Sequence, residues 1–230
     1  MHDALTDDIA ALPVDETTLL SACKTNFPSP IAPAQRHLSK QEKITFIAEK
    51  FRDIMEILGL DLSDESLQHT PSRVAKMYVE EIFSGLDPDT FPTVSLFEDR
   101  FQHDQQSNMI FVKVDFCSFC EHHFVPMNGT ACVAYIPNGK LFGFSTIPKI
   151  IKHFAKRPQL QERLTAQIAD ALSILSGSDD IAVSLCAQHQ CMIARGTESN
   201  NSHVITNVLR GSFSTNFPLR EEFFKATTSH

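Results

Sequence analysis

The chain has 230 residues, 42% of them hydrophobic, and a formal net charge of −8. This length supports one sizeable hydrophobic core. The negative charge argues against a general nucleic-acid binder, although local lysines and arginines can still hold a small anionic ligand. There is no apolar run of transmembrane length and no secretory signal in the acidic start, which predicts a cytoplasmic protein without a membrane partner. In that reducing compartment, six cysteines indicate metal binding or catalysis before disulfides.

The first third of the chain is predicted to be a tail followed by helices. Residues 1–38 contain four prolines and no lasting periodicity, so we expect a flexible tail. Ser39 and Glu42 fit a capping box, and apolar residues follow at helical spacing up to a stop at Gly59. A short helix is expected from Ser63. Another is expected from residue 70, with proline in its first turn and Gly85 at its end.

The rest of the chain alternates between strands and one pair of helices. Strands are predicted over 110–116, 181–187, 191–195 and 203–209. The Asn-Gly pairs at 128–129 and 138–139 predict hairpin turns in a meander. Helices are predicted over 148–155, from Pro158 to a stop at Gly177, and over 219–226. This order favours an α+β fold with a largely antiparallel sheet and helices on one face.

Two segments carry soft metal ligands. The segment 117–123 holds two cysteines and two histidines, and 186–191 holds two cysteines and a histidine. The spacing of Cys120 and His123 lets one turn present both side chains to one ion. In an extended segment, His189 and Cys191 point the same way, whereas Cys186 points away. Three protein ligands leave a position for water, as in catalytic zinc sites, and we therefore choose Cys120, His123 and Cys191.

Two other interpretations use the same cysteines. A closed structural zinc site has four ligands, here Cys117, Cys120, Cys186 and Cys191. A Cys117–Cys120 redox pair is less favoured, because a thioredoxin-type motif opens a helix and this one leads into a meander. In our preferred site, two imidazoles beside the metal serve as proton carriers near neutral pH, namely His122 and His189.

The same segment resembles the GTP cyclohydrolase I family. The resemblance rests on CEHHFV (120–125), VAYIP (133–137), RPQLQERLT (157–165), His189-x-Cys191 and Ala-Arg-Gly (194–196). Upstream, TPSRVAKMY (70–78) and EIFSGL (81–86) also match. The matched region covers roughly residues 40–228. Several motifs in a fixed order are far more specific than a single CxxC pair.

The resemblance implies a fold, an assembly and a reaction. The fold is the tunnelling fold (T-fold), in which antiparallel sheets of several subunits join into a barrel. Residues 39–230 then form one catalytic domain, with a helical part at 39–90 and a T-fold core at 91–230. Family members are homodecamers of two stacked pentamers, with active sites at subunit boundaries. They convert GTP and water to 7,8-dihydroneopterin triphosphate and formate, at the entry to folate and pterin synthesis, with Zn2+ as cofactor.

The resemblance also implies a role for each matched residue. Zinc activates the water that attacks C8 of the purine and is held by Cys120, His123 and Cys191. The catalytic group comprises His122 and His189, which match proton-transfer residues, and Gln161, which matches a neighbouring substrate contact. The guanine edge is anchored by Glu162, with Ser145 as a neighbouring substrate contact. The triphosphate is held by cationic side chains, here Arg73, Lys76, Lys149 and Arg195.

The chain departs from the family pattern at one phosphate-binding position. The family reads Gly-Leu-Ser-Lys where this chain has Gly-Phe-Ser-Thr at 143–146, so Thr146 replaces a lysine. The stretch 202–211 also departs from a threonine-rich pattern. One alternative is therefore a related enzyme with altered phosphate recognition, acting on another guanine nucleotide or giving another product. A second alternative is a non-catalytic oligomeric zinc-binding protein.

Overall fold

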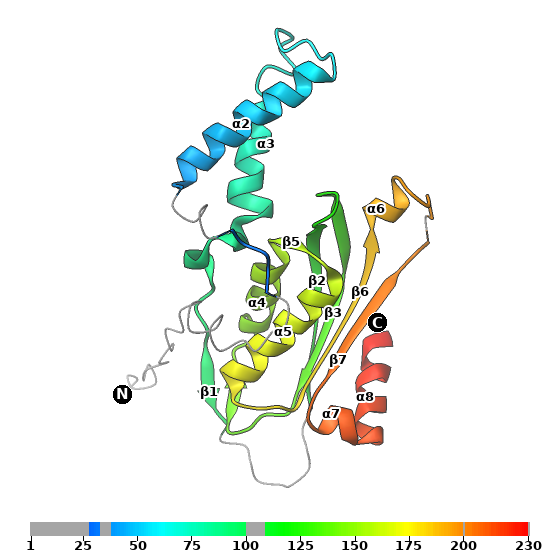
Figure 1. The fold of residues 1–230 in the computed structure, drawn as a ribbon. Coiled ribbons are helices and arrows are strands. Elements are labelled where there is room, and N and C mark those ends of the chain that lie inside the picture. The colour runs from blue at the N-terminus through cyan, green and yellow to red at the C-terminus, as the bar shows by residue number, and fades with distance from the viewer. Residues whose placement is uncertain (1–27, 33–37, 100–108, 200, 230) are drawn as a thin grey trace, which may run out of the picture.

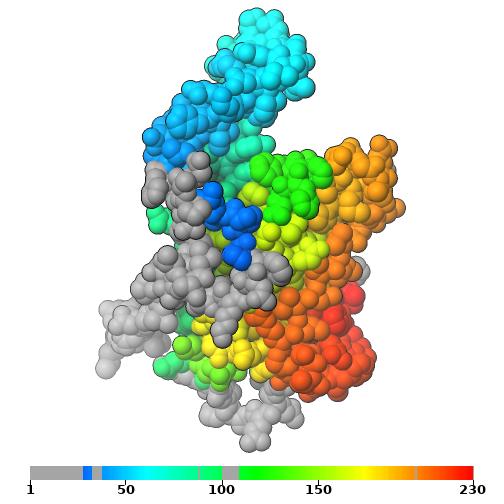
Figure 2. Space-filling model, in the orientation of Figure 1, coloured from blue at the N-terminus to red at the C-terminus, as the bar shows by residue number. Residues whose placement is uncertain are grey.

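The structure is a computed structural model that describes residues 28–32, 38–99, 109–199 and 201–229. A helical part precedes the sheet. Helix α2 (Lys40–Ile57) begins with the predicted capping box: Ser39 Oγ accepts from the Glu42 amide, and the Glu42 carboxylate accepts from the Ser39 amide. Helix α3 (Thr70–Lys76) continues into a π-helix, η2 (Met77–Ile82). Figures 1 and 2 show α2 and α3 packed together and standing clear of the body of the molecule.

Two details of this helical part differ from the prediction. The short helix expected from Ser63 is wrong, because the segment forms turns. In these turns, Asp61 and Asp64 accept hydrogen bonds from the amides of Ser63 and Ser66, and such local bonds compete with a helix. The helix from residue 70 ends at Ile82, before Gly85, which lies in the 3-10 helix η3 (Ser84–Leu86) and is followed by η4 (Pro88–Thr90).

A five-stranded sheet forms the centre of the fold. Its order is β5–β2–β3–β6–β7, and every pair is antiparallel except β2–β5. The strands are β2 (Ile110–Cys120), β3 (Pro126–Tyr135), β5 (Pro158–Gln159), β6 (Ile181–His189) and β7 (Val204–Leu209). A separate ribbon pairs β1 (Leu96–Glu98) with β4 (Lys140–Phe142). The predicted strands at 110–116, 181–187 and 203–209 are thus confirmed.

The expected turn at residues 128–129 is wrong. Both residues lie inside β3, and the chain reverses instead at 121–125, between β2 and β3. Gly129 is required by packing, since a Cβ there would lie 2.1 Å from the backbone oxygen of Cys186 on β6. The second Asn-Gly pair does lie in a turn, with Gly139 at φ 74°, but the following strand β4 pairs with β1 rather than with β3.

The strand expected at 191–195 is also wrong, because β6 ends at His189 and a short helix, α6 (Gln190–Ile193), follows. Its neighbour β3 begins at Pro126, and the last pair in the ladder is Met127 with His189. Beyond that pair β6 has no neighbouring strand on the β3 side. Proline also lacks the amide hydrogen that would extend the ladder.

Helices cover both faces of the sheet, whereas the order of elements predicted helices on one face only. On one face lie α4 (Thr146–Ala155) and α5 (Gln161–Ser176), which pack on alternate residues of β3 such as Val133 and enclose the main core (Figure 1). Helix α5 stops at Gly177 in the left-handed conformation, as predicted. On the other face lie α7 (Ser212–Thr215) and α8 (Phe217–Thr228), where Phe213 and Phe223 pack on Cys132. Among the described residues, none of the helices has the length and apolar composition needed to cross a bilayer.

Candidate metal centre and active site

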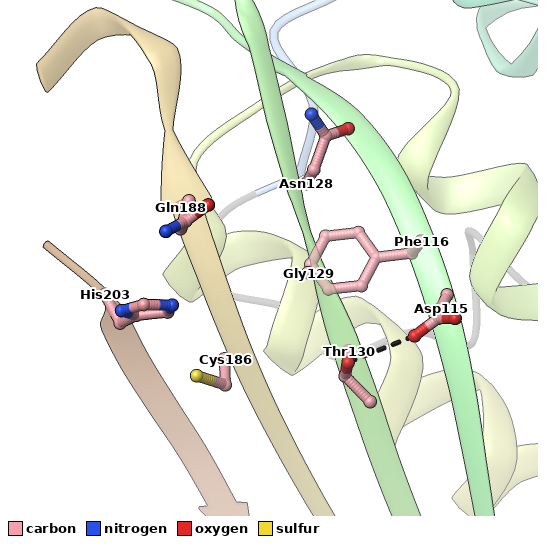
Figure 3. A pocket seen from close by; sticks show the side chains of 8 residues that line it. All are labelled: Asp115, Phe116, Asn128, Gly129, Thr130, Cys186, Gln188 and His203. Carbon is pink, nitrogen blue, oxygen red and sulfur yellow. Dashed lines mark hydrogen bonds between the residues drawn. The ribbon is translucent and has the colours of Figure 1, made fainter. Parts of the chain in front are cut away.

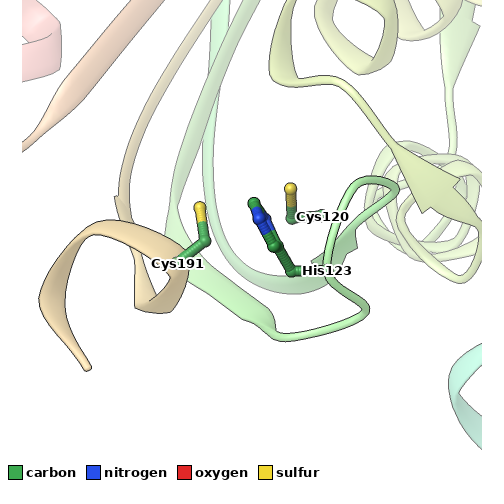
Figure 4. Close-up of side chains that lie close together, drawn as sticks. All are labelled: Cys120, His123 and Cys191. Carbon is green, nitrogen blue, oxygen red and sulfur yellow. The ribbon is translucent and has the colours of Figure 1, made fainter. Parts of the chain in front are cut away.

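Three side chains from distant parts of the sequence meet at one end of the sheet (Figure 4). Cys120 is the last residue of β2, His123 lies in the turn after it, and Cys191 belongs to α6. Their ligand atoms all lie within 4.8 Å of one another. Cys120 is buried, Cys191 is half-buried and His123 is exposed, so the cluster opens to solvent on the histidine side.

The chemistry of this cluster suits a metal ion. Two thiols and an imidazole are donors that borderline and soft metal ions prefer, and magnesium and calcium do not. Burial raises the pKa of the Cys191 thiol, and the adjacent Cys120 thiol raises it further. An ion that binds here must therefore displace thiol protons, because thiolates are the ligand form. Three ligands also leave one coordination position for water.

The structure does not bring the four cysteines of the closed-site interpretation together. Side chains alternate along a strand, so Cys117 and Cys120 lie on opposite faces of the sheet. Cys186 likewise lies on the face away from α4 and α5, whereas His189 lies on the helix-covered face. The same alternation separates the two thiols of the Cys117–Cys120 redox interpretation, and every cysteine in the described part of the chain is a free thiol.

The turn that carries His122 and His123 is held from several sides. The Cys120 amide donates to Val125 O at 2.9 Å, and the Phe124 amide donates to Cys120 O at 2.8 Å. Phe124 has a φ of 54°, a left-handed conformation that is rare for a bulky residue. Its ring packs edge-on against Tyr78 and Phe83, which come from η2 and the residue after it. These contacts fix the direction in which the turn presents its histidines.

An ion pair joins this turn to the start of α5. Arg163 donates to both carboxylate oxygens of Glu121, at 2.6 and 3.3 Å. The side chains keep only 9% and 20% of their exposure, so the pair is largely shielded from water. The Glu121 amide also donates to Gln159 O at 3.0 Å. The ion pair therefore ties the ligand-bearing turn to the first turn of α5.

His189 lies on the helix-covered face and contacts α5. Its Nε2 is 2.7 Å from Oε1 of Gln161, a side chain that is almost fully buried. Burial lowers the pKa of His189, and the nearby Glu162 carboxylate partly offsets this. The imidazole is therefore neutral over a wider pH range than a free histidine. The family resemblance placed Gln161 in the catalytic group, and the structure adds that its amide contacts this imidazole.

Arg195 directly contacts His123, one of the three candidate metal ligands. Its Nη1 lies 2.8 Å from Nε2 of His123, and both side chains are exposed. A guanidinium only donates, so Nε2 of His123 accepts in this arrangement. A neutral imidazole has one such lone pair. An ion held by His123 would use the same lone pair and would therefore compete with Arg195 for it.

The predicted substrate residues fall into two groups in space. Glu162 lies near His189, since its carboxylate raises the pKa of that imidazole, and Arg195 contacts His123. His122 lies in the ligand turn, with its ring centroid 6.2 Å from that of His123. The second group is carried by other helices. Two of its cations are exposed on α3, Arg73 and Lys76, and two of its members are exposed at the start of α4, Ser145 and Lys149.

The start of α4 lies far from the candidate metal ligands of the same chain. The other end of α4 lies beside the end of β2, since Ser118 Oγ donates to Ala155 O at 2.7 Å. Ser145 precedes Ala155 by ten residues, which is about 15 Å along a helix. Thr146 is buried, and its hydroxyl lies 3.3 Å from both the amide and the carbonyl of Ser95. That hydroxyl is thus engaged with the protein.

A separate hollow lies on the opposite face of the sheet (Figure 3). Its volume is about 430 Å³, and it is lined by Asp115, Phe116, Asn128, Gly129, Thr130, Cys186, Gln188 and His203. None of the predicted site residues lines it. The sheet itself separates this hollow from the metal cluster, so we do not assign it to the same site.

Sequence reasoning missed several residues that support the site. Glu121 and Arg163 lie inside matched motifs, but only the fold shows that they pair. Thr206 lies in the stretch that departs from the family pattern, and its hydroxyl is 3.2 Å from Nε2 of Gln161. The one signal available in the sequence was the alternation of side chains along the predicted strand, which places Thr206 on one face of the sheet together with every second residue.

Comparison with known proteins identifies close relatives. The family model described as GTP cyclohydrolase I matches residues 47–228. A protein of Aeromonas salmonicida (strain A449) named GTP cyclohydrolase 1 is 50% identical over 187 residues, which cover 81% of this chain and 84% of the relative. A protein of the same name from Salmonella arizonae is 44% identical over 203 residues, covering 88% and 90%. A solved archaeosine synthase QueF-like structure aligns with a TM-score of 0.38 at 14% identity, over 45% of this chain and 94% of that one.

Proposed function

The chain belongs to the GTP cyclohydrolase I family, and we propose that it opens the purine ring of GTP at C8 with the help of zinc. The products are formate and 7,8-dihydroneopterin triphosphate, which feeds folate and pterin synthesis. The observation that carries the proposal is the Cys120–His123–Cys191 cluster with His189 beside it. The free thiols of the described cysteines fit the reducing cytoplasm in which we expect this reaction.

The residues of the cluster hold the ion, and its neighbours handle protons. Zinc, when bound, supplies an activated water for the attack on C8. His189, neutral and oriented by Gln161, moves protons at the reacting ring, and the exposed His122 does so from the ligand turn. The Glu162 carboxylate accepts from the amino and N1 edge of guanine, which favours guanine over adenine. Its position directly after Gln161 places it next to His189 along α5.

We assign the triphosphate to a cationic group. Arg195 lies beside His123, and its exposed guanidinium is one of these cations. The remaining cations come from α3 and from the start of α4, and they are Arg73, Lys76 and Lys149. Exposed guanidinium and ammonium groups bind phosphate oxygens through charge-assisted hydrogen bonds.

A complete site requires a second copy of the chain. Ser145 and Lys149 lie at the far end of α4 from the end of β2 that carries Cys120, so one chain does not bring all the proposed contacts together. Large apolar side chains are also strongly exposed, with Ile57 at 84% and Phe144 at 92%. Such residues are commonly covered in an interface. We therefore propose a homo-oligomer with shared sites, a decamer of two pentamers in the family arrangement.

One observation favours a second candidate function with altered phosphate recognition. Thr146 stands where the family has a phosphate-binding lysine, and its hydroxyl is bound to the Ser95 backbone. It therefore supplies neither charge nor a free donor. A lost charge-assisted contact costs about 1.5–3 kcal/mol, or roughly ten- to hundredfold in affinity. Comparing turnover of GTP, GDP and GMP separates the two candidates, since a GTP enzyme prefers the triphosphate.

The decisive experiment is turnover of GTP by anaerobic, zinc-loaded protein, with formate and pterin fluorescence followed together. We expect both products to form in step. The variant His122→Ala should abolish turnover while zinc content stays at about one ion per chain. The matched control is His203→Ala, which removes an exposed imidazole beside the hollow on the other sheet face and should leave turnover unchanged. Absence of formate from every guanine nucleotide would favour a non-catalytic zinc-binding protein.

A further inference from the structure

Four polar side chains form a continuous chain of hydrogen bonds from the interior to His189. Gln161 begins helix α5, Thr165 lies one turn further along, and Thr206 faces them from β7. Gln161 and Thr165 are almost fully buried, at 2% and 1% exposure. The chain therefore lies between the helix and the sheet, where an unsatisfied polar group is costly.

The surroundings of Gln161 fix the orientation of its amide. Nε2 lies 3.1 Å from Leu185 O and 2.9 Å from Val204 O, which are both acceptors. The reverse orientation would place the amide oxygen against two carbonyl oxygens. Oε1 therefore points at His189, and because it only accepts, the hydrogen of that 2.7 Å bond belongs to Nε2 of His189.

The two threonine hydroxyls are assigned by the same reasoning. Thr165 Oγ1 lies 2.7 Å from Gln161 O, which can only accept, so Thr165 donates there. The hydroxyl–hydroxyl contact of 2.6 Å then takes its hydrogen from Thr206. Thr206 Oγ1 keeps its lone pairs for Gln161 Nε2, at 3.2 Å. Each hydroxyl thus donates once, and the two amide hydrogens of Gln161 serve three acceptors, so one hydrogen is shared between two of them.

We propose that Thr206 and Thr165 are positioning residues that hold Gln161, and that Gln161 acts through His189 by fixing its ring with Nε2 protonated. Nδ1 of His189 is then the ring nitrogen that carries the lone pair. Both amide hydrogens of Gln161 are shared among three acceptors of the protein, Leu185 O, Val204 O and Thr206 Oγ1, so none is left for the guanine base. The catalytic consequence rests on the proposed function, whereas the orientation of His189 does not.

Kinetics of three variants test the catalytic part. Gln161→Met keeps the length of the side chain but removes the acceptor, and we expect kcat to fall about a hundredfold, as a misplaced group does. Thr206→Val keeps the shape and should lower kcat about tenfold. KM for GTP and zinc content should stay within twofold in both. The double variant should be no slower than Gln161→Met alone, because both changes act through one chain.

Two controls separate positioning from general damage. Thr206→Ser restores the hydroxyl and should recover kcat to within about twofold of the wild type. Thr130→Val makes the same change on the other sheet face, where the hydroxyl donates to Asp115 at 3.1 Å, and should leave kcat unchanged. A rise in KM with unchanged kcat in Gln161→Met would overturn the proposal, since it would show that the amide binds the substrate.

A direct readout of the ring is independent of turnover. Solid-state NMR of zinc-loaded protein labelled with 15N-histidine reports which imidazole nitrogen carries hydrogen, and a His189→Asn sample identifies the signal. We expect Nε2–H in the wild type and a mixture of tautomers in Gln161→Met. A wild-type ring protonated on Nδ1 alone would overturn the proposal. Failure of GTP turnover with the Nε2–H result would instead reject only the proposed function.

Discussion

The Arg163–Glu121 ion pair offers a sharp test of how the ligand turn is held. Arg163→Met removes the guanidinium but keeps much of the side-chain volume. Breaking a fully buried pair costs about 3–5 kcal/mol, because one charge is left without its partner. Glu121 keeps 20% of its exposure and can reach water, and Arg163 Nε has no hydrogen-bond partner in the described part of the chain. We therefore expect a loss of about 2–3 kcal/mol in the free energy of unfolding.

A double-mutant cycle isolates the pair from other effects of the substitution. Urea unfolding is compared for wild type, Arg163→Met, Glu121→Gln and the double variant, at one protein concentration because assembly contributes to stability. The matched control cycle uses the exposed Lys225–Glu221 pair, with side chains 75% and 51% exposed, for which we expect about 0.5 kcal/mol or less.

The same variant should also lose metal faster. Glu121 lies between Cys120 and His123, so a loosened turn presents the two ligands less precisely. We expect transfer of zinc to a chelator to be at least about tenfold faster in Arg163→Met than in wild type. A coupling energy below about 1 kcal/mol together with an unchanged rate of zinc transfer would refute the reasoning, since the pair would then be a surface contact.

Three further predictions follow from the fold and the site. Gly129→Ala should destabilise the protein by at least about 3 kcal/mol in thermal unfolding, because its Cβ would lie 2.1 Å from a backbone oxygen of β6; an unchanged Tm would contradict the register. Thr146→Lys should lower KM for GTP up to about tenfold and leave KM for GMP unaffected, at the cost of about 1 kcal/mol for the bonds to Ser95; equal effects on both nucleotides would exclude a contact to the β- or γ-phosphate. Zinc affinity, measured by competition with a chelator, should rise from pH 6 to 8, because the Cys191 thiol has a raised pKa in the metal-free protein and must lose its proton to bind; a flat profile would exclude thiolate ligation.

Local signals in the sequence predicted the fold best where the structure is itself local. The capping box at Ser39 and the stop at Gly177 are determined by residues within one turn, and both are confirmed. The Asn-Gly pair at 128–129 carries the same kind of signal, but Gly129 is required by a close neighbour strand rather than by a turn. A glycine alone does not distinguish these two causes, since both exclude a side chain.

In the site, too, the sequence predicted the local features and missed the contacts between distant segments. The spacing of Cys120 and His123 predicted a shared ligand turn, because three residues are enough to define it. Cys191 joins them, but from helix α6 rather than from the extended segment on which its selection was based. Thr206 and Arg163 acquire their contacts only when β7 and the ligand turn pack on α5, so no pattern along the chain reveals them.

The imidazoles of His123 and His189 differ in the way that their proposed roles require. His123 accepts from Arg195, an exposed side chain that can leave, so its lone pair is available to an incoming ion. His189 donates to Gln161, whose amide is fixed by two backbone carbonyls and cannot turn. A ligand must be free to exchange its partner for the metal, whereas a proton carrier must keep its ring direction through each cycle. The environments of the two residues therefore support the same assignment that their spacing in the sequence indicated.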